Sequence, residues 1–325
     1  MGTSLPTDVL FALKMISDSF PVGKLKGVGR KLGGSYNLNI KIETSKGEFV
    51  ARIMNRSNRV EHLNYVQTVL AKLTEKGLPV LNPILTQEGE AFISFNDKLL
   101  QVSPFVRAET FQNSPKQVAA SARMLSTLHQ AIQFPQSGPE PAWSFNRPSD
   151  YYSNALADLK RIPGIPSRQL SEAEKLAEDI LATWNQSQKD LPSAIIHGDW
   201  HFWNQLYKDN EVYSIMDFDF MEHGKRIHDI AYSMWVIYII LPKYTKGFDE
   251  LFIKEYIGLT KEEVNILPVA IARVSLFFLC QSAYAANPEE KWRRHFRKQI
   301  PLIQWLLSNS RFHEIVQENN ENKEL

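Results

Sequence analysis

Alternating hydrophobic and polar positions dominate much of the first hundred residues. The segment "KLKGVGRKLGGSYNLNIKIETSKGEFVARIMN" alternates in this way and is interrupted at "GGS" and at "SKG". Because successive side chains on a strand point to opposite faces, we expect strands near residues 24–31, 36–44 and 48–54, with tight turns between them. Two further runs, "AFISF" and "KLLQVSPF", are separated only by "ND" and predict a hairpin.

Hydrophobic residues at helical spacing appear between these two groups of strands. In "RVEHLNYVQTVLAKLTEKG" the apolar positions recur as they do along one face of a helix, and Gly77 supplies its end. The expected order of elements in this part of the chain is therefore three strands, one helix and two strands.

Helical spacing replaces alternation beyond Pro104. Three helices are expected first, over "SPKQVAASARMLSTLHQAI", "SDYYSNALADLKRI" and "SEAEKLAEDILATWNQSQ". Ser114 is the expected N-cap of the first helix, with Pro115 in its first turn. Ser171 and Glu174 have the spacing of a capping box and predict the start of the third helix.

Nearly every residue from Asp229 onward is expected to be helical. The sequence therefore predicts an α+β fold with two lobes: a small β-rich lobe, residues 1–103, and a larger, mostly helical lobe, residues 104–325. The apolar runs "MWVIYIILP" and "ILPVAIARVSLFFLC" are expected to be buried core helices, because the first is too short to span a bilayer and Arg273 interrupts the second.

Charge and cysteine content narrow the expected partners and compartment. The 325 residues carry a net charge of +1, so no global field attracts nucleic acid or a membrane surface, and neither is an expected partner. A single cysteine, Cys280, rules out an intramolecular disulfide and fits a reducing compartment. The first residues lack the pattern of a secretory signal, so a cytoplasmic location is expected.

One stretch interrupts the helical lobe, between Ile195 and Phe218. "SAIIHGDW" predicts a short strand that enters a loop, and "QLY", "KDN" and "VYSIMDF" predict two strands around a tight turn. Asp199 lies in the loop, Asn204 follows it five residues later, and Asp217 ends the second strand, so the three side chains can face one space. Phosphoryl transfer requires such a set: one carboxylate accepts the proton of the attacking hydroxyl, while an amide oxygen and a second carboxylate hold the Mg²⁺ that bridges ATP phosphates.

The spacing in this stretch resembles that of known kinases. His197-x-Asp199-x-x-x-x-Asn204 matches the spacing of the protein-kinase catalytic loop H-R-D-x-x-x-x-N. The variant "HGD", followed by "IMDFD" and "HDIAY", resembles the aminoglycoside phosphotransferase and choline kinase family, which includes type II homoserine kinases, methylthioribose kinases and spore-coat kinase-like proteins. "GGSYN", "FVARIMN", "LLQVSPFV" and "MLSTLHQAI" resemble the family's phosphate loop, third strand, hinge and a helix with a Leu-His pair. The resemblance covers most of the chain and implies a two-lobed, protein-kinase-like fold.

The resemblance also implies a role for particular positions. Asp199 would be the catalytic base, and Asn204 and Asp217 would be the Mg²⁺ ligands. Arg52 stands where many members carry a lysine that neutralises the α- and β-phosphates. Backbone groups would complete the ATP site, with the phosphates near Gly33, Gly34 and Ser35 and the adenine near Gln101, Val102 and Ser103.

One position departs from the kinase pattern. Kinases pair the third-strand cation with a glutamate on the following helix, and counting back from Gly77 places this position on or near Gln67, which has no charge. Either an amide hydrogen bond from Gln67 replaces the ion pair or the register differs, in which case Glu61 is the nearest acidic residue. His197 is expected to support the loop by hydrogen bonding, and Asp219 either assists the metal or makes a structural hydrogen bond.

Other single features favour structural roles. His197 and His201 have a spacing that could suggest zinc, but no cysteine lies nearby and Asp199 is better explained as a base. "GVGRKLGGS" matches neither the P-loop nor the dinucleotide-binding fingerprint. Asp229, at the start of a helical run, is expected to be a structural cap.

The expected activity is ATP- and Mg²⁺-dependent phosphorylation of a hydroxyl group on an amino-alcohol, amino-acid-like or aminoglycoside-like small molecule. The helical lobe has no obvious acidic run for a polycation, which slightly favours the first two acceptor classes. Two alternatives stay open: an atypical protein Ser/Thr kinase, and a non-catalytic, kinase-shaped binding protein. The presence of all three of Asp199, Asn204 and Asp217 argues against the second. The sequence does not specify an oligomeric state.

Overall fold

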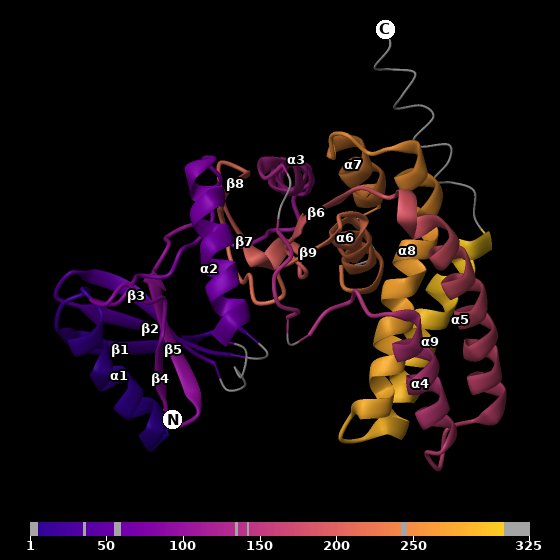
Figure 1. Ribbon diagram of the computed structural model, residues 1–325, viewed down its shortest axis with the longest axis horizontal. Helices are drawn as coiled ribbons and strands as arrows, with labels where there is room; N and C mark the ends of the chain where they lie inside the picture. The colour runs from indigo at the N-terminus through magenta and orange to yellow at the C-terminus, as the bar shows by residue number, and fades with distance from the viewer. Residues whose placement is uncertain are drawn as a thin grey trace, which may run out of the picture. The chain divides into compact units, whose positions relative to one another are not determined.

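The computed structural model describes six stretches of the chain: residues 6–34, 37–54, 60–133, 136–141, 143–241 and 246–308. The chain divides into two compact units (Figure 1). Unit 1 contains residues 1–109, 139–142 and 213–216, and unit 2 contains residues 110–138, 143–212 and 217–325.

Unit 1 is built on a five-stranded antiparallel sheet. Its strands are β1 (Leu25–Leu32), β2 (Asn37–Thr44), β3 (Gly47–Met54), β4 (Ile93–Phe95) and β5 (Lys98–Pro104), in the order β1-β2-β3-β5-β4. These bounds confirm the strands expected from the alternating pattern. The helix α2 (Val60–Glu75) follows β3, as the helical spacing predicts.

Alternation along the strands gives the sheet two apolar faces. Ile53 and Leu100 belong to one buried cluster, whereas their sequence neighbours Met54 and Leu99 belong to another that includes Leu63 of α2. Because adjacent residues on a strand point to opposite faces, the two clusters lie on opposite sides of the sheet. Helix α2 therefore covers one face.

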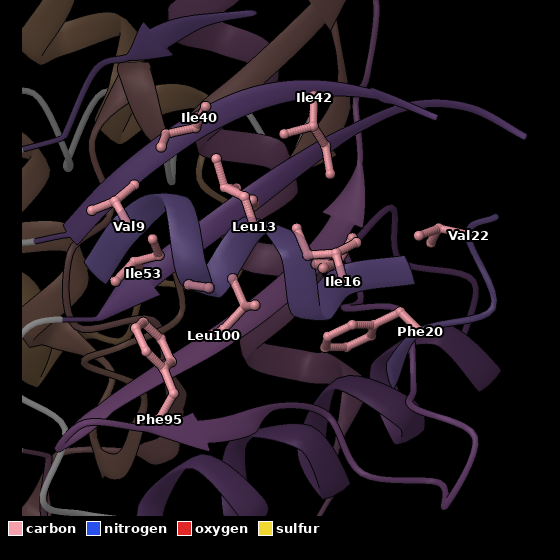
Figure 2. Close-up of a cluster of buried hydrophobic side chains, with 13 residues drawn as sticks. Val9, Leu13, Ile16, Phe20, Val22, Ile40, Ile42, Ile53, Phe95 and Leu100 are labelled. Atoms are coloured by element: carbon pink, nitrogen blue, oxygen red, sulfur yellow. The ribbon is translucent and has the colours of Figure 1, made fainter. Parts of the chain in front are cut away.

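The other face is covered by α1 (Thr7–Ser19), which precedes the first strand. Val9, Leu13 and Ile16 of this helix are buried against Ile40 and other residues of the sheet (Figure 2). The expected order of three strands, one helix and two strands omits α1 and is incomplete in this respect. The helix buries the apolar face of the sheet that α2 leaves uncovered.

Unit 2 is mostly helical, as expected. Its helices are α3 (Pro115–Ala131), α4 (Ser149–Lys160), α5 (Ser167–Ser187), α6 (Ile227–Ile239), α7 (Phe248–Glu255), α8 (Lys261–Cys280) and α9 (Pro288–Ser308). The stretch between α5 and α6 contains the short strands β6 (Ser193–Ile196), β7 (Gln205–Lys208), β8 (Glu211–Ile215) and β9 (Glu222–Lys225). Strands β7 and β8 pair around Asp209 and Asn210, whose φ angles of 52° and 66° are those of a tight hairpin turn.

The two long apolar runs form helices α6 and α8, and both are largely buried, as predicted. The stretch Lys261–Tyr284 is long and apolar enough to cross a membrane by length and composition, but 78% of its most apolar window is buried inside the protein. It is a core helix of unit 2.

One local expectation is confirmed only in part, and another needs correction. Ser114 occupies the N-cap position of α3, but its hydroxyl donates to Asn210 Oδ1 at 3.3 Å and makes no cap hydrogen bond. Helix α5 begins at Ser167, so the capping-box pattern at Ser171 lies inside the helix. The helix therefore has one turn more than expected, residues 167–170, in which Leu170 is buried.

Candidate active site

The loop after β6 turns sharply at Gly198. This residue has φ +77°, and a Cβ atom placed on it would lie 2.1 Å from the carbonyl oxygen of Phe220. Only glycine can adopt this backbone conformation without displacing the neighbouring chain. The turn carries the chain from the buried end of β6 directly to Asp199.

Asp199 and Asn204 are hydrogen-bonded to each other. The amide nitrogen of Asn204 donates both to the backbone carbonyl of Asp199 and to its Oδ2 atom, each at 3.0 Å. Two backbone bonds tighten the loop between them, from His201 N to Asp199 O and from Asn204 N to His201 O, both at 2.9 Å. The loop thus brings together the two residues that the sequence placed five positions apart.

Asp217 adds a second carboxylate to this region of unit 2. It follows β8 and has φ +65°, a left-handed conformation that is uncommon outside glycine. The pKa of Asp199 is raised to about 7, mainly by burial and also by the negative charges of Asp217 and Asp229, while hydrogen bonds from Tyr232 and Asn204 oppose the shift. The negative charge of Asp217 therefore acts on the ionisation of Asp199.

These side chains fit a hard divalent cation such as Mg²⁺. The amide nitrogen of Asn204 makes the hydrogen bonds to Asp199, so its oxygen is left available as a ligand. The carboxylate of Asp217, whose charge acts on Asp199, offers the negative charge and the oxygen donor that Mg²⁺ prefers. Among the described residues no group of three or more His, Cys, Asp or Glu side chains could hold a metal ion, so a cation here would depend on few protein ligands.

Asp229 fixes the backbone of the loop, a role that differs from the expected cap. The N-cap of α6 is Arg226, whereas Asp229 is only 1% exposed and accepts hydrogen bonds from His197 N at 2.7 Å and Gly198 N at 2.9 Å. Its Oδ2 atom also lies 3.1 Å from His129 Nε2. The sequence signal for this role is a carboxylate surrounded by apolar residues on a largely buried helix.

The two histidines of the loop have different surroundings. His197 is fully buried, its Nδ1 atom accepts a hydrogen bond from Asp199 N at 3.3 Å, and its ring lies 4.7 Å from that of Phe218. These contacts are those of a residue that supports the loop. His201 Nε2 lies 3.6 Å from Asp199 Oδ2, and burial lowers its pKa to about 4. His201 is therefore neutral near pH 7 and does not form an ion pair with Asp199 there.

The aromatic residues of the loop differ in exposure. Trp200 and Phe202 are buried in unit 2, and the indole nitrogen of Trp200 donates to Ser121 Oγ at 3.0 Å. Trp203 is 40% exposed and packs edge-on against Phe111. Packing therefore accounts for Trp200 and Phe202, and Trp203 is the aromatic residue of the loop that a bound molecule could reach.

Asp219 is half-buried and lies two residues beyond Asp217 in the chain.

Unit 1 contains the residues expected to bind the nucleotide. Arg52 lies on β3 between its register partners Asn39 on β2 and Gln101 on β5. Val102 and Ser103 continue β5, opposite Ala51 and Val50.

The glycine loop follows β1. Gly34 has φ +134°, and Asn39 Nδ2 donates to the carbonyl oxygen of Gly33 at 3.0 Å, which ties the loop to β2. Ser35 lies outside the described residues. On α2, Gln67 is half-buried and Glu61 is exposed, so Gln67 is the better placed of the two to contact other side chains of unit 1.

Comparison with known proteins matches the chain to a phosphotransferase family and to homoserine kinases. The family model of the phosphotransferase enzyme family matches residues 30–259. A homoserine kinase of Caulobacter vibrioides (strain NA1000 / CB15N) is 24% identical over 212 residues, and the match covers 62% of each protein, less than two thirds of that relative's length. A homoserine kinase of Rhizobium meliloti (strain 1021) is 24% identical over 280 residues, which cover 82% of this chain and 81% of the relative.

Solved structures share the fold. The amicoumacin kinase hAmiN, solved in complex with AMP-PNP, Ca²⁺ and Ami, superposes with a TM-score of 0.69 at 16% identity over 90% of this chain and 93% of that protein. At this identity the likeness concerns the fold alone. It confirms the expected α+β, protein-kinase-like architecture.

Proposed function

The chain belongs to the phosphotransferase enzyme family, and from this premise we propose that it is a kinase that transfers the γ-phosphoryl group of ATP to a hydroxyl group of a small molecule. The observation that carries the proposal is the carboxylate of Asp199, hydrogen-bonded to Asn204 on a loop whose backbone is held by Asp229. A buried carboxylate in a fixed position, with a second carboxylate nearby, is suited to proton transfer beside a charged phosphate.

Asp199 is the proposed general base. It accepts the proton of the acceptor hydroxyl as the oxygen attacks the γ-phosphorus, and the hydrogen bonds from Asn204 and Tyr232 fix the orientation of the carboxylate. Asn204 and Asp217 are the proposed ligands of Mg²⁺, through the amide oxygen and the carboxylate. When bound, this ion neutralises charge on the phosphates.

Residues of unit 1 are proposed to bind the nucleotide. Arg52 pairs with phosphate oxygens, which its planar guanidinium can contact with two N–H groups at once. The backbone N–H groups of residues 33–35 bind phosphate, and those of residues 101–103 bind adenine. Gln67 is proposed to orient Arg52 in place of the usual glutamate.

An amino-acid-like or amino-alcohol acceptor is the proposed substrate class, and homoserine is the first compound to test, because the curated relatives are homoserine kinases. We propose a cytoplasmic location from the single cysteine.

The function is tested by measuring ADP formation with ATP and Mg²⁺ against a panel of homoserine, amino alcohols, aminoglycosides and a protein substrate. ADP formation that depends on a small acceptor supports the proposal. Phosphorylation of the protein substrate alone would favour an atypical protein kinase, and no acceptor-dependent turnover would favour a binding protein.

Magnesium-dependent nucleotide binding is the first expected result. ATP should raise the melting temperature more in Mg²⁺ than in a chelator, because a ligand that binds only the folded state stabilises it in proportion to its affinity. Asp217→Asn should reduce the difference between the two conditions, since it removes one proposed ligand. Differential scanning fluorimetry measures both. Equal shifts with and without Mg²⁺ in the unmodified protein would contradict the assignment of Asn204 and Asp217.

Arg52 gives a second expected result. Arg52→Ala should weaken ATP much more than adenosine, because only ATP carries the charge that Arg52 meets, and Arg52→Lys should restore part of the loss. Gln67→Glu is expected to change ATP affinity only modestly, because a stronger contact to Arg52 opposes the added repulsion of the phosphates. Isothermal titration with both ligands measures these effects. If Arg52→Ala weakened ATP and adenosine equally, Arg52 would have a structural role.

A further inference from the structure

A buried arginine in the middle of α8 has no acidic partner among the residues that the structure describes. Arg273 is 4% exposed, and its guanidinium lies over the rings of Trp184, at 4.6 Å, and Tyr152, at 5.3 Å. One Nη atom donates to the backbone carbonyl of Arg147, while its Nε atom is buried and finds no hydrogen-bond partner in the described parts of the chain. Burial of an unpaired charge is costly, and a buried donor without an acceptor adds to the cost.

A second unpartnered donor lies against the same indole ring. His228 on α6 is 5% exposed, and its ring centroid lies 5.1 Å from that of Trp184. Its Nε2 atom is buried and has no hydrogen-bond partner within the six described stretches. Burial and the positive charges of Arg273 and Lys225 hold the pKa of His228 well below its usual value. The imidazole is therefore neutral, and in one tautomer its Nε2 atom carries a hydrogen that can be donated.

The surroundings of these two side chains are positively charged. Lys225 donates to the carbonyl oxygen of Leu191 at 2.6 Å, and no carboxylate of the described residues pairs with it, with Arg147 or with Arg273. Arg226 of the same unit differs, since it pairs with Glu263 at 2.6 Å. The interior beside Trp184 therefore combines excess positive charge with two N–H groups that lack acceptors.

We propose that Arg273 and His228 bind a small monovalent anion of halide size, such as chloride, in the interior of unit 2. A halide needs only N–H donors around it, and the Nε–H of Arg273 and the Nε2–H of His228 supply two. Carboxylate and phosphate groups carry several acceptor oxygens, each of which would need a donor, whereas both side chains here are almost completely buried and offer one unpartnered N–H group each. The anion offsets the charge of Arg273 and completes the two missing hydrogen bonds.

Crystals of the unmodified protein grown or soaked in bromide give the direct test, because bromide scatters anomalously. We expect an anomalous peak in contact with Arg273 Nε and His228 Nε2. A water molecule at this position, or no density, in crystals that contain bromide would overturn the proposal. This result does not depend on catalytic activity or on the identity of the acceptor.

Chloride titration tests the site in solution. At constant ionic strength, replacing gluconate by chloride should raise the melting temperature of the unmodified protein in a saturable way. Arg273→Met should abolish this dependence, whereas Arg297→Met, which removes an exposed arginine of α9, should retain it. A melting temperature independent of chloride in the unmodified protein, or equal dependence in both variants, would overturn the proposal.

If Arg273→Met fails to fold, a second variant, His228→Leu, tests the same anion site. His228→Leu removes one neutral donor and no charge, so folding is easier to retain. It should raise the chloride concentration at half-maximal stabilisation by about tenfold, the loss expected for one hydrogen bond to a charged group. An unchanged midpoint would exclude His228 from the site.

Discussion

Replacing Asp199 by asparagine is expected to lower turnover by about 10²- to 10⁴-fold while leaving the affinity for ATP nearly unchanged. The amide cannot accept the proton of the attacking hydroxyl, but it has nearly the same shape, and its oxygen can still accept the hydrogen bond from Asn204. A neutral amide is also easier to bury than a carboxylate, so the variant should fold at least as stably as the unmodified protein. Steady-state kinetics, isothermal titration and urea unfolding on the same preparation separate these effects.

Asp217→Asn is the matched control for this prediction. Its carboxylate is proposed to bind Mg²⁺, so its loss should weaken Mg²⁺-dependent ATP binding as well as turnover. The opposite pattern, with ATP binding lost in Asp199→Asn and retained in Asp217→Asn, would show that the two roles are exchanged.

Asp229→Ala is expected to cost about 3 kcal/mol or more of the free energy of unfolding and most of the activity. The substitution leaves His197 N, Gly198 N and His129 Nε2 without their acceptor, and an unsatisfied buried donor costs about 1–3 kcal/mol. The same bonds hold the backbone that carries Asp199, so a displaced loop should lower turnover. Urea unfolding and steady-state kinetics measure the two losses.

Asp249→Ala provides the matched control for the loss of stability. Asp249 is also a buried aspartate in the first turn of a helix, but among the described residues it accepts a single hydrogen bond, from Tyr238 Oη at 3.1 Å, and none from the loop. Its removal should cost less stability and leave turnover nearly unchanged. Equal losses of stability and activity in Asp229→Ala and Asp249→Ala would mean that Asp229 has no special connection to the loop.

The strands of unit 1 follow from the sequence because alternation reports directly which side chains are buried. Helix α1 could not be predicted in this way. Two apolar residues on its outer side, Leu10 and Phe11, are 43% and 53% exposed. They obscure the helical spacing of the buried residues Val9, Leu13 and Ile16. Strand β9 is missed for a related reason. All four of its residues are half-buried, so it shows no alternation and is recognised only by its pairing with β6.

In the candidate site, the contacts between residues close in the chain could be predicted, whereas those between distant residues could not. Asp199 and Asn204 are close in the chain, so their spacing alone predicts that they can meet. The role of Asp229 depends on partners 31 and 32 residues away in the loop, and on His129, 100 residues away. Local spacing cannot reveal such contacts, and a capping role is the natural interpretation of an aspartate at the start of a helix.

Transfer of the γ-phosphoryl group to a defined acceptor is the most direct test of the proposed function. The measurement follows ATP labelled at the γ-phosphorus in the presence of Mg²⁺ and the best acceptor of the panel, with the unmodified protein and with Asp199→Asn. We expect the label to appear as a phosphate ester of the acceptor hydroxyl, and we expect Asp199→Asn to form this ester about 10²- to 10⁴-fold more slowly. Ester formation at the same rate in both proteins would contradict the role of Asp199, and release of label only as inorganic phosphate would contradict the proposed transfer.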